Sequence, residues 1–169
     1  YGDKSAVSYT YYSLRNLPYT VLMDVAIKEK KDITINGASV MEAPDALKDV
    51  QNYYNEIDRP HVVISLLTST AKSPTGKLLM CASNTFLFSE KHGEEPRVIH
   101  EMWDNNMHMM KISKKIKAGE TYRFSIAGAS ITSAHHDDPL NEAERSAIFA
   151  KLEGRERLIS FHKKAWDEL

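Results

Sequence analysis

The sequence predicts an antiparallel β-sandwich (supersandwich-like) followed by two C-terminal helices. The residues up to about 132 form successive strand-like segments separated by turn residues. Helical spacing of apolar residues begins only after Ser133. Strands followed by helices exclude the alternating βαβ order of a parallel sheet. The 169 residues suffice for one domain with a small appendage, and we expect a sandwich domain over 1–133 and a helical linker over 134–169.

Eight segments of the first part have strand character. They are rich in β-branched and aromatic residues, as in the run TVLMDVAIK after Tyr19, or they alternate between apolar and polar residues. Turn residues separate them, for example at 74–76 and 118–120. The predicted strands span residues 5–14, 19–28, 33–40, 61–70, 77–88, 98–103, 107–116 and 121–132.

Residues 41–60 are predicted to form a long loop with one short helical turn. This segment holds Pro44, Pro60 and a polar aromatic cluster, QNYYNEID. Loops of this length are uncommon in compact domains and are often functional. Tyrosine and asparagine side chains suit a sugar ring and its hydroxyls. The candidate carbohydrate contacts are therefore Asn52, Tyr53, Tyr54 and Asn55. In the alternative interpretation, the tyrosines of this loop only cover the open end of the sandwich.

The part after Ser133 predicts two helices separated at Gly154. Asp137 or Asp138 is the N-cap candidate of the first helix, and Pro139 stands at its first helical position. Gly154 ends or bends this helix. The second helix has one apolar face, formed by Leu158, Phe161, Ala165, Trp166 and Leu169. We expect the two helices to pack together, with at least half of the side chain buried at Leu158, Phe161 and Trp166.

The composition excludes several classes of function. Lys plus Arg number 22 and Asp plus Glu number 23, so a net charge of −1 provides no basic surface for nucleic acid or for an anionic membrane. No apolar run approaches the roughly 18 residues of a membrane span. The single cysteine, Cys81, excludes an internal disulfide framework and a cysteine-based zinc finger. We expect a soluble protein without a cofactor, and both the bacterial cytoplasm and the periplasm stay open.

The two ends predict a piece of a longer chain. Tyr1 stands where an initiator Met is expected, and the last residues continue a helical pattern. The opening residues alternate like a strand and lack the charged and then apolar pattern of a secretory leader. A catalytic centre is therefore expected to lie outside this sequence.

Two sets of residues contain side chains of the kinds that bind metal ions, and a structural role is favoured for both sets. The first is the run His135, His136, Asp137 and Asp138. Adjacent side chains diverge, so a loop that caps a helix N-terminus explains this run better. The second set suits copper and comprises His100, Met102, His108 and Met110. Because Met107 and Met109 lie on the opposite strand face, methionine as core filler explains both faces. No metal site is predicted.

The spacing of the residues predicts no catalytic group either. The residue types of a hydrolase triad occur as Ser160, His162 and Asp167. Positions 160 and 162 of a helix point away from each other, so no Ser–His hydrogen bond forms. The paired carboxylates that glycosidases need occur as Glu94 with Glu95 and as Glu56 with Asp58. No second group is placed near either pair by the sequence, so solvated carboxylates are the simpler interpretation.

Two segments carry a resemblance to a known family. The stretch YSLRNLPYTVLMDVAIKEKKDITI, with its R-x-L-P segment before a long strand, resembles the N-terminal domain of glycoside hydrolase family 65. This family contains maltose, trehalose and kojibiose phosphorylases and related hydrolases. The tail is also similar, since TSAHHDDPLNEA is followed by Gly154 and by a helix with the H-x-x-x-W spacing of His162 and Trp166. The resemblance covers nearly the whole chain.

The resemblance implies a large N-terminal β-sandwich, a helical linker, an (α/α)₆ catalytic barrel and a small C-terminal sheet. It places the general acid in the barrel, outside this sequence, so it assigns no catalytic residue here. The implied function is a non-catalytic domain of a glycosidase or disaccharide phosphorylase, with the barrel of the same chain as partner and a sugar as a candidate ligand. The alternatives are a free-standing carbohydrate-binding module and a structural domain that forms a homodimer.

Overall fold

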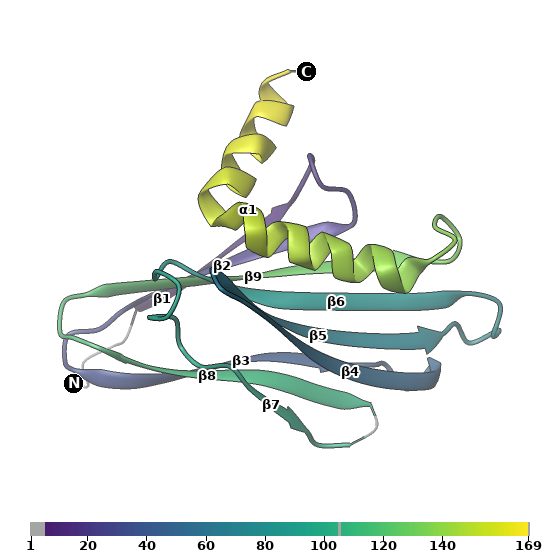
Figure 1. The fold of residues 1–169 in the computed structure, drawn as a ribbon, viewed down its shortest axis with the longest axis horizontal. Helices are drawn as coiled ribbons and strands as arrows, with labels where there is room; N and C mark the ends of the chain where they lie inside the picture. Colours follow the sequence, from purple (N-terminus) through teal and green to yellow (C-terminus); the bar gives the residue numbers. More distant parts are fainter. Residues whose placement is uncertain (1–5, 105, 169) are drawn as a thin grey trace.

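The computed structural model describes residues 6–104 and 106–168. Within these residues the chain forms nine strands and one helical element, α1 (Figure 1). Ser5, where the first strand was predicted to begin, and Leu169 of the predicted apolar face lie outside the described residues. The elements are β1 (Ala6–Ser13), β2 (Thr20–Lys28), β3 (Ile33–Glu42), β4 (Lys48–Arg59), β5 (Val62–Lys72), β6 (Leu79–Phe88), β7 (Ile99–Met102), β8 (Met107–Ile116), β9 (Thr121–Thr132) and α1 (Pro139–Asp167).

The strands form two antiparallel sheets. The larger sheet has the order β1-β2-β9-β6-β5-β4, and the smaller has the order β3-β8-β7. A mainly β, antiparallel fold with a helical C-terminal part is therefore confirmed. Among the described residues, no helix is long and apolar enough to cross a membrane.

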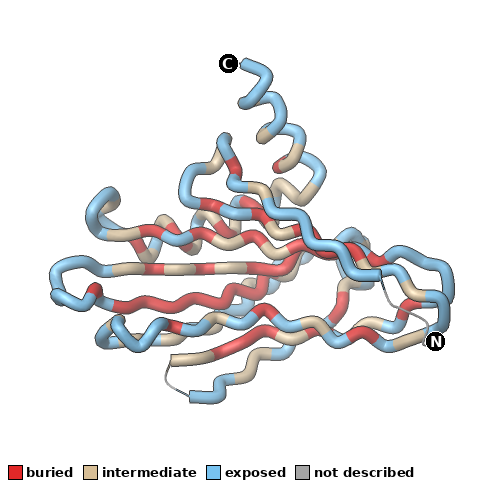
Figure 2. The backbone as a smooth tube through the Cα atoms, turned by 180° about the vertical axis from the view of Figure 1, so that it is seen from behind, coloured by how far each residue is buried: buried red, intermediate tan, exposed pale blue. Residues whose placement is uncertain are grey.

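The main hydrophobic core lies between the two sheets. Leu67, Phe86 and Phe124 of the larger sheet belong to one buried cluster with Met110 and Ile112 of the smaller sheet. Figure 2 shows the buried residues along the central strands, whereas the C-terminal half of α1 is largely exposed. We call this pair of sheets the two-sheet body.

The prediction of a loop over residues 41–60 is wrong. Met41 and Glu42 end β3, a turn closes at Leu47, whose N–H donates to the Pro44 carbonyl at 2.9 Å, and Lys48–Arg59 form the strand β4. This strand pairs antiparallel with β5 from Gln51 to Arg59. β4 is an edge strand and most of its residues are exposed, so it lacks the apolar alternation that reveals a strand in a sequence.

The two predicted helices form one helical element with a bend. Asp138 caps its start, accepting a hydrogen bond from the Asn141 N–H at 3.1 Å, as the sequence indicates. Gly154 has φ 77° and ψ 162°, a conformation essentially restricted to glycine, and it turns the chain in mid-helix. The bend was predicted correctly, but the expectation of two separate helices that pack together is wrong. The two halves diverge (Figure 1).

The first half of α1 lies on the outer face of the larger sheet. Ala143, Ala147 and Ala150 are fully buried there, and their small side chains let the helix approach the strands closely. Leu158, just beyond the bend, is also fully buried, and Phe161 is 38% exposed, as predicted. Trp166 is 54% exposed, which contradicts the prediction, because α1 has left the sheet at this point.

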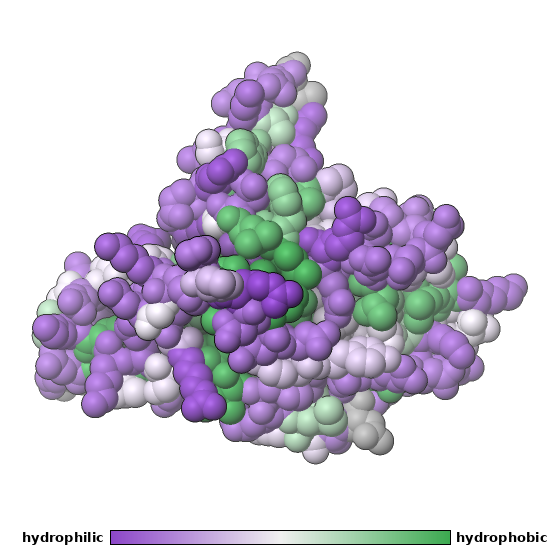
Figure 3. Space-filling model, viewed as in Figure 1, coloured by the Kyte–Doolittle hydropathy of each residue, from purple (hydrophilic) through white to green (hydrophobic). Residues whose placement is uncertain are grey.

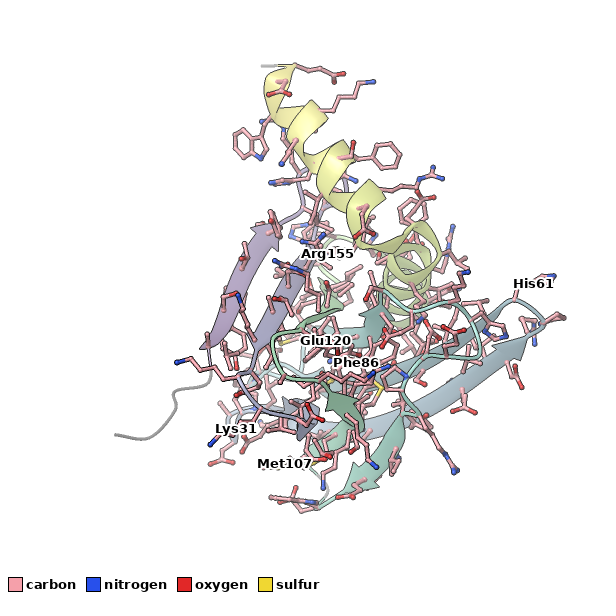
Figure 4. The ribbon with its side chains drawn as sticks, turned by 90° about the vertical axis from the view of Figure 1, so that its left-hand side faces the viewer. Lys31, His61, Phe86, Met107, Glu120 and Arg155 are labelled. Atoms are coloured by element: carbon pink, nitrogen blue, oxygen red, sulfur yellow. The ribbon has the colours of Figure 1, made fainter. Side chains whose placement is uncertain are left out.

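An ion pair fixes the helix to the sheet directly after the bend. Arg155 of α1 donates from Nε to Asp24 Oδ1 at 2.6 Å and from Nη2 to Asp24 Oδ2 at 2.8 Å. Asp24 lies on β2 and is 4% exposed, and Ser125 of β9 donates a further bond to it at 2.9 Å. Burial raises the pKa of Asp24, but the bonds and charges of Arg155, Ser125 and Arg123 outweigh it and lower this pKa below its usual value. Figure 4 shows Arg155 at the bend of α1.

The C-terminal half of α1 is attached to the connection between β1 and β2. The Arg15 N–H donates to His162 Nδ1 at 3.1 Å, and the Arg15 guanidinium lies 4.7 Å from the centre of the Trp166 ring. His162 and Trp166, the two residues of the H-x-x-x-W spacing, therefore both contact Arg15. His162 thus has a structural contact, in line with the absence of a Ser160–His162 hydrogen bond expected from the sequence.

We expect Arg155→Met to lower the free energy of unfolding by about 3 kcal/mol at neutral pH, the lower end for a broken buried ion pair. The variant loses both short bonds to the buried Asp24 carboxylate, which keeps only Ser125 and the 3.5 Å contact with Arg123. The pKa of Asp24 is lowered in the folded state, so its contribution is present above the ordinary Asp pKa and is lost as the pH falls through the folded value. Urea denaturation across this acidic range should show that the difference in free energy of unfolding between wild type and Arg155→Met shrinks as the pH falls. The control is Arg157→Met, which removes an exposed guanidinium paired with Glu153 and should cost less than about 1 kcal/mol. Equal losses in the two variants at neutral pH would contradict this account.

Candidate functional site

The structure separates the four residues predicted to contact carbohydrate. They are consecutive on β4, and successive side chains of a strand point to opposite faces. Asn52 and Tyr54 lie on the face that looks toward the smaller sheet, whereas Tyr53 and Asn55 lie on the exposed face. The Tyr53 hydroxyl donates to the Gln51 side chain on that exposed face. The four residues therefore do not form one surface.

Tyr54 belongs to a stack of rings between the sheets. Its ring lies parallel to His100 of β7 with centroids 4.6 Å apart, and His100 meets His108 of β8 edge-on at 5.6 Å. Ser69 of β5 continues the contact, since its hydroxyl donates to Asn52 Oδ1 at 2.6 Å and lies 2.9 Å from His108 Nε2. We call this group, formed by Asn52, Tyr54, Ser69, His100 and His108, the histidine stack.

The hydrogen bonds define the protonation of His108. The Ser69 hydroxyl uses its one proton to donate a hydrogen bond to Asn52, so it accepts a hydrogen bond from the Nε2–H group of His108. His108 Nδ1 is then the unprotonated nitrogen of a neutral ring, and it is buried without a hydrogen-bond partner in the described residues. Burial, aided by His100, lowers the pKa of His108 from 6.5 to about 4, and burial also lowers the pKa of His100. Both rings are thus neutral near pH 7 and act by packing and hydrogen bonding.

The residue sets considered as metal sites have other contacts. His100 and His108 are in the histidine stack, and Met110 is fully buried in the core between the sheets. His135 and His136 lie against the Tyr19 ring, with centroids 6.1 and 5.6 Å away. Over residues 6–104 and 106–168, no three His, Cys, Asp or Glu side chains are placed to share a metal ion.

A cavity of about 460 Å³ opens beside the histidine stack. Tyr54 and Glu56 come from β4, Phe86 and Phe88 from β6, His100 from β7 and Lys151 from α1, and the loop between β6 and β7 completes the wall. Figure 4 shows Phe86 in the interior, whereas His61 stands at the outer tip of the hairpin between β4 and β5. We call this space the Tyr54 cavity. Its other lining residues are Val63, Ser65, His92, Gly93, Glu95, Pro96, Arg97, Val98 and Ile99.

An ion pair ties the wall of the Tyr54 cavity to α1. Lys151 Nζ lies 2.8 Å from Glu95 Oε1, and the two side chains are only 7% and 18% exposed. The ammonium group also lies 5.1 Å from the centre of the Phe88 ring. Removing either partner would leave the other charge in a poorly solvated position, so the pair holds the loop in place.

Carboxylates from different parts of the chain face this cavity. Glu56 and Glu95 both line it, although the sequence pairs them with Asp58 and Glu94, which do not. The Tyr54 hydroxyl donates to Glu56 Oε2 at 3.2 Å. Lys151 and His92 were missed in the sequence, because no local pattern distinguishes them from solvated surface residues. The arrangement can bind a ligand through several donors and acceptors around an aromatic floor.

The pH dependence of stability tests the buried state of His108. The folded state keeps the ring neutral, so its contribution is complete above pH 6.5 and is lost as the pH falls toward about 4. In wild type, this effect of His108 should lower the free energy of unfolding by roughly 3 kcal/mol between pH 6.5 and pH 4. We expect His108→Gln to remove this part of the pH dependence. The control is His61→Gln, a change at an exposed hairpin position. Chemical denaturation from pH 7 to 4 measures both, and an unchanged slope in His108→Gln would refute the assignment.

Comparison with known proteins identifies relatives along the whole chain. No protein-family model matches it. It is 63% identical over 169 residues to a kojibiose hydrolase of Mucilaginibacter mallensis and 46% identical over 169 residues to a kojibiose hydrolase of Flavobacterium johnsoniae. Each match covers 100% of this chain and 25% of the relative, so the chain spans a quarter of the length of these curated proteins.

A solved structure has the same fold. A protein from the human microbiome assigned as a kojibiose phosphorylase matches 96% of this chain and 21% of its own chain, with a TM-score of 0.70 and 8% sequence identity. At this identity the match shows the fold alone. The two sequence relatives are kojibiose hydrolases, and the protein that shares the fold is assigned as a kojibiose phosphorylase, so the comparisons agree with the resemblance seen in the sequence.

Proposed function

We propose that this chain is the non-catalytic β-sandwich domain of a disaccharide-cleaving enzyme, and that it supports the catalytic part of the same polypeptide. The alignment of the whole chain with one quarter of two kojibiose hydrolases carries this proposal. The remaining three quarters of such a protein would contain the catalytic residues. The substrate we propose for the whole protein is kojibiose. We favour hydrolysis over phosphorolysis, because both sequence relatives are hydrolases and the phosphorylase shares only the fold.

The outer surface of α1 supports the proposed contact with the catalytic part. Four large apolar side chains are exposed along this element, namely Phe149, Leu152, Phe161 and Trp166. Figure 3 shows apolar side chains gathered around the bend of α1. Scattered apolar residues are normal on a surface, but several on one helix are typical of a contact surface. The occupant we propose is the rest of the same polypeptide, since the relatives are about four times as long as this chain.

We expect the 169-residue chain alone neither to hydrolyse nor to phosphorolyse kojibiose, trehalose or maltose. The reason is that the family resemblance puts the general acid in the barrel. Of the two carboxylates that line the Tyr54 cavity, Glu95 is held in an ion pair by Lys151. Glucose release and sugar phosphate formation are measured with and without phosphate, with the full-length parent enzyme as positive control. Turnover by the chain that a point substitution within it abolishes would overturn the proposal of a non-catalytic domain.

Leu152→Ser tests the supporting role. Leu152 is 61% exposed in this chain, so the chain alone should change by less than about 0.5 kcal/mol. In the full-length enzyme, where we propose that Leu152 is covered, the loss should be about 1.5–3 kcal/mol and should lower the melting temperature. Lys163→Ser, on the exposed part of α1, is the control and should be silent in both proteins. Equal effects of Leu152→Ser in the chain and in the full-length enzyme would show that nothing covers this surface.

A further inference from the structure

We infer that the Tyr54 cavity is a saccharide-binding site. The inference rests on the proposed function in one respect, namely that the parent enzyme meets sugars. The volume of the cavity, about 460 Å³, lies within the roughly 300–1,000 Å³ that is usual for small-molecule sites. Of the four predicted carbohydrate contacts, only Tyr54 lines this cavity. The other lining groups come from distant segments of the chain.

The charges around the cavity favour a neutral ligand. Glu95 and Lys151 neutralise each other in their ion pair, and Glu56 and Arg97 contribute one further charge of each sign. An anion would meet the Glu56 carboxylate, and a cation would meet the Arg97 guanidinium. Saccharide hydroxyls both donate and accept hydrogen bonds, so they match a wall with carboxylate acceptors and cationic donors.

The apolar part of the lining suits the carbon skeleton of a sugar. Phe86, Phe88 and Val63 form apolar wall beside the polar groups. One face of the Tyr54 ring is covered by His100, so Tyr54 contributes its hydroxyl and its edge. The lining thus combines apolar side chains with oriented polar groups, as small-molecule sites do.

The site is built before a ligand arrives. The histidine stack holds Tyr54, and Tyr54 in turn donates to Glu56 at 3.2 Å. The opposite wall is held by the ion pair between Lys151 and Glu95 and by the buried Pro96. Because these groups are already fixed, binding requires little ordering of side chains, which favours affinity.

The test is a titration of the 169-residue chain with kojibiose and, separately, with glucose, followed by NMR of the backbone amides. We expect saturable shifts at residues that line the cavity, including Gly93 and Val98. Glu56→Gln and Tyr54→Phe should each weaken binding about five- to tenfold. The first replaces a charged acceptor by a neutral amide and the second removes a hydroxyl, while both keep the shape and the ring stack. Asp58→Asn removes a carboxylate on the same strand outside the cavity and should leave the affinity unchanged. The melting temperature of each variant checks that it is folded.

Four outcomes would overturn the inference. Three are the absence of saturable shifts with both sugars, shifts that lie away from the cavity, and equal affinity in wild type and Glu56→Gln. The fourth is displacement of the sugar by inorganic phosphate, because it would indicate an anion site. The proposed supporting function does not depend on this result, since Leu152→Ser in the full-length enzyme tests it without any sugar bound to the cavity.

Discussion

The ion pair between Asp24 and Arg155 determines the course of α1 over the two-sheet body, and other parts of the structure depend on that course. Two short bonds join the side chains directly after the bend at Gly154. Before the bend, buried alanines hold the helix against the larger sheet. The helix is thus fixed on both sides of Gly154, and Lys151 between these contacts lies over the end of β6, against Phe88.

The Tyr54 cavity follows from this position of Lys151. Its ion pair with Glu95 draws the loop between β6 and β7 toward α1 and forms one wall. The histidine stack forms the other side of the cavity. Within the stack, Ser69 of β5 forms hydrogen bonds with Asn52 of β4 and with His108 of β8. The same helix that closes the cavity also exposes apolar residues such as Leu152 on its outer surface. One element therefore links the proposed sugar site to the proposed contact with the catalytic part.

Where the structure departs from the sequence-based predictions, particular residues give the physical cause. The residues of β4 are mostly polar and exposed, which is typical of a loop, and only the pairing with β5 makes them a strand. Trp166 was expected in a helix pair, but the glycine at 154 turns α1 away from the sheet, and the Trp166 ring contacts Arg15. The eight other strands were found because each carries local apolar or β-branched character.

The sequence alone indicates eight of the nine described strands, the helical C-terminal part, the cap at Asp138, the bend at Gly154 and the resemblance carried by the two ends. These features depend on neighbouring residues, whose conformational preferences act locally. Two contacts emerge only from the folded arrangement: Glu56, Glu95 and Lys151 line one cavity, and Asp24 meets Arg155. These residues are far apart in the chain, and each alone resembles a solvated surface charge. Their meeting depends on sheet pairing and helix docking, which no local pattern encodes.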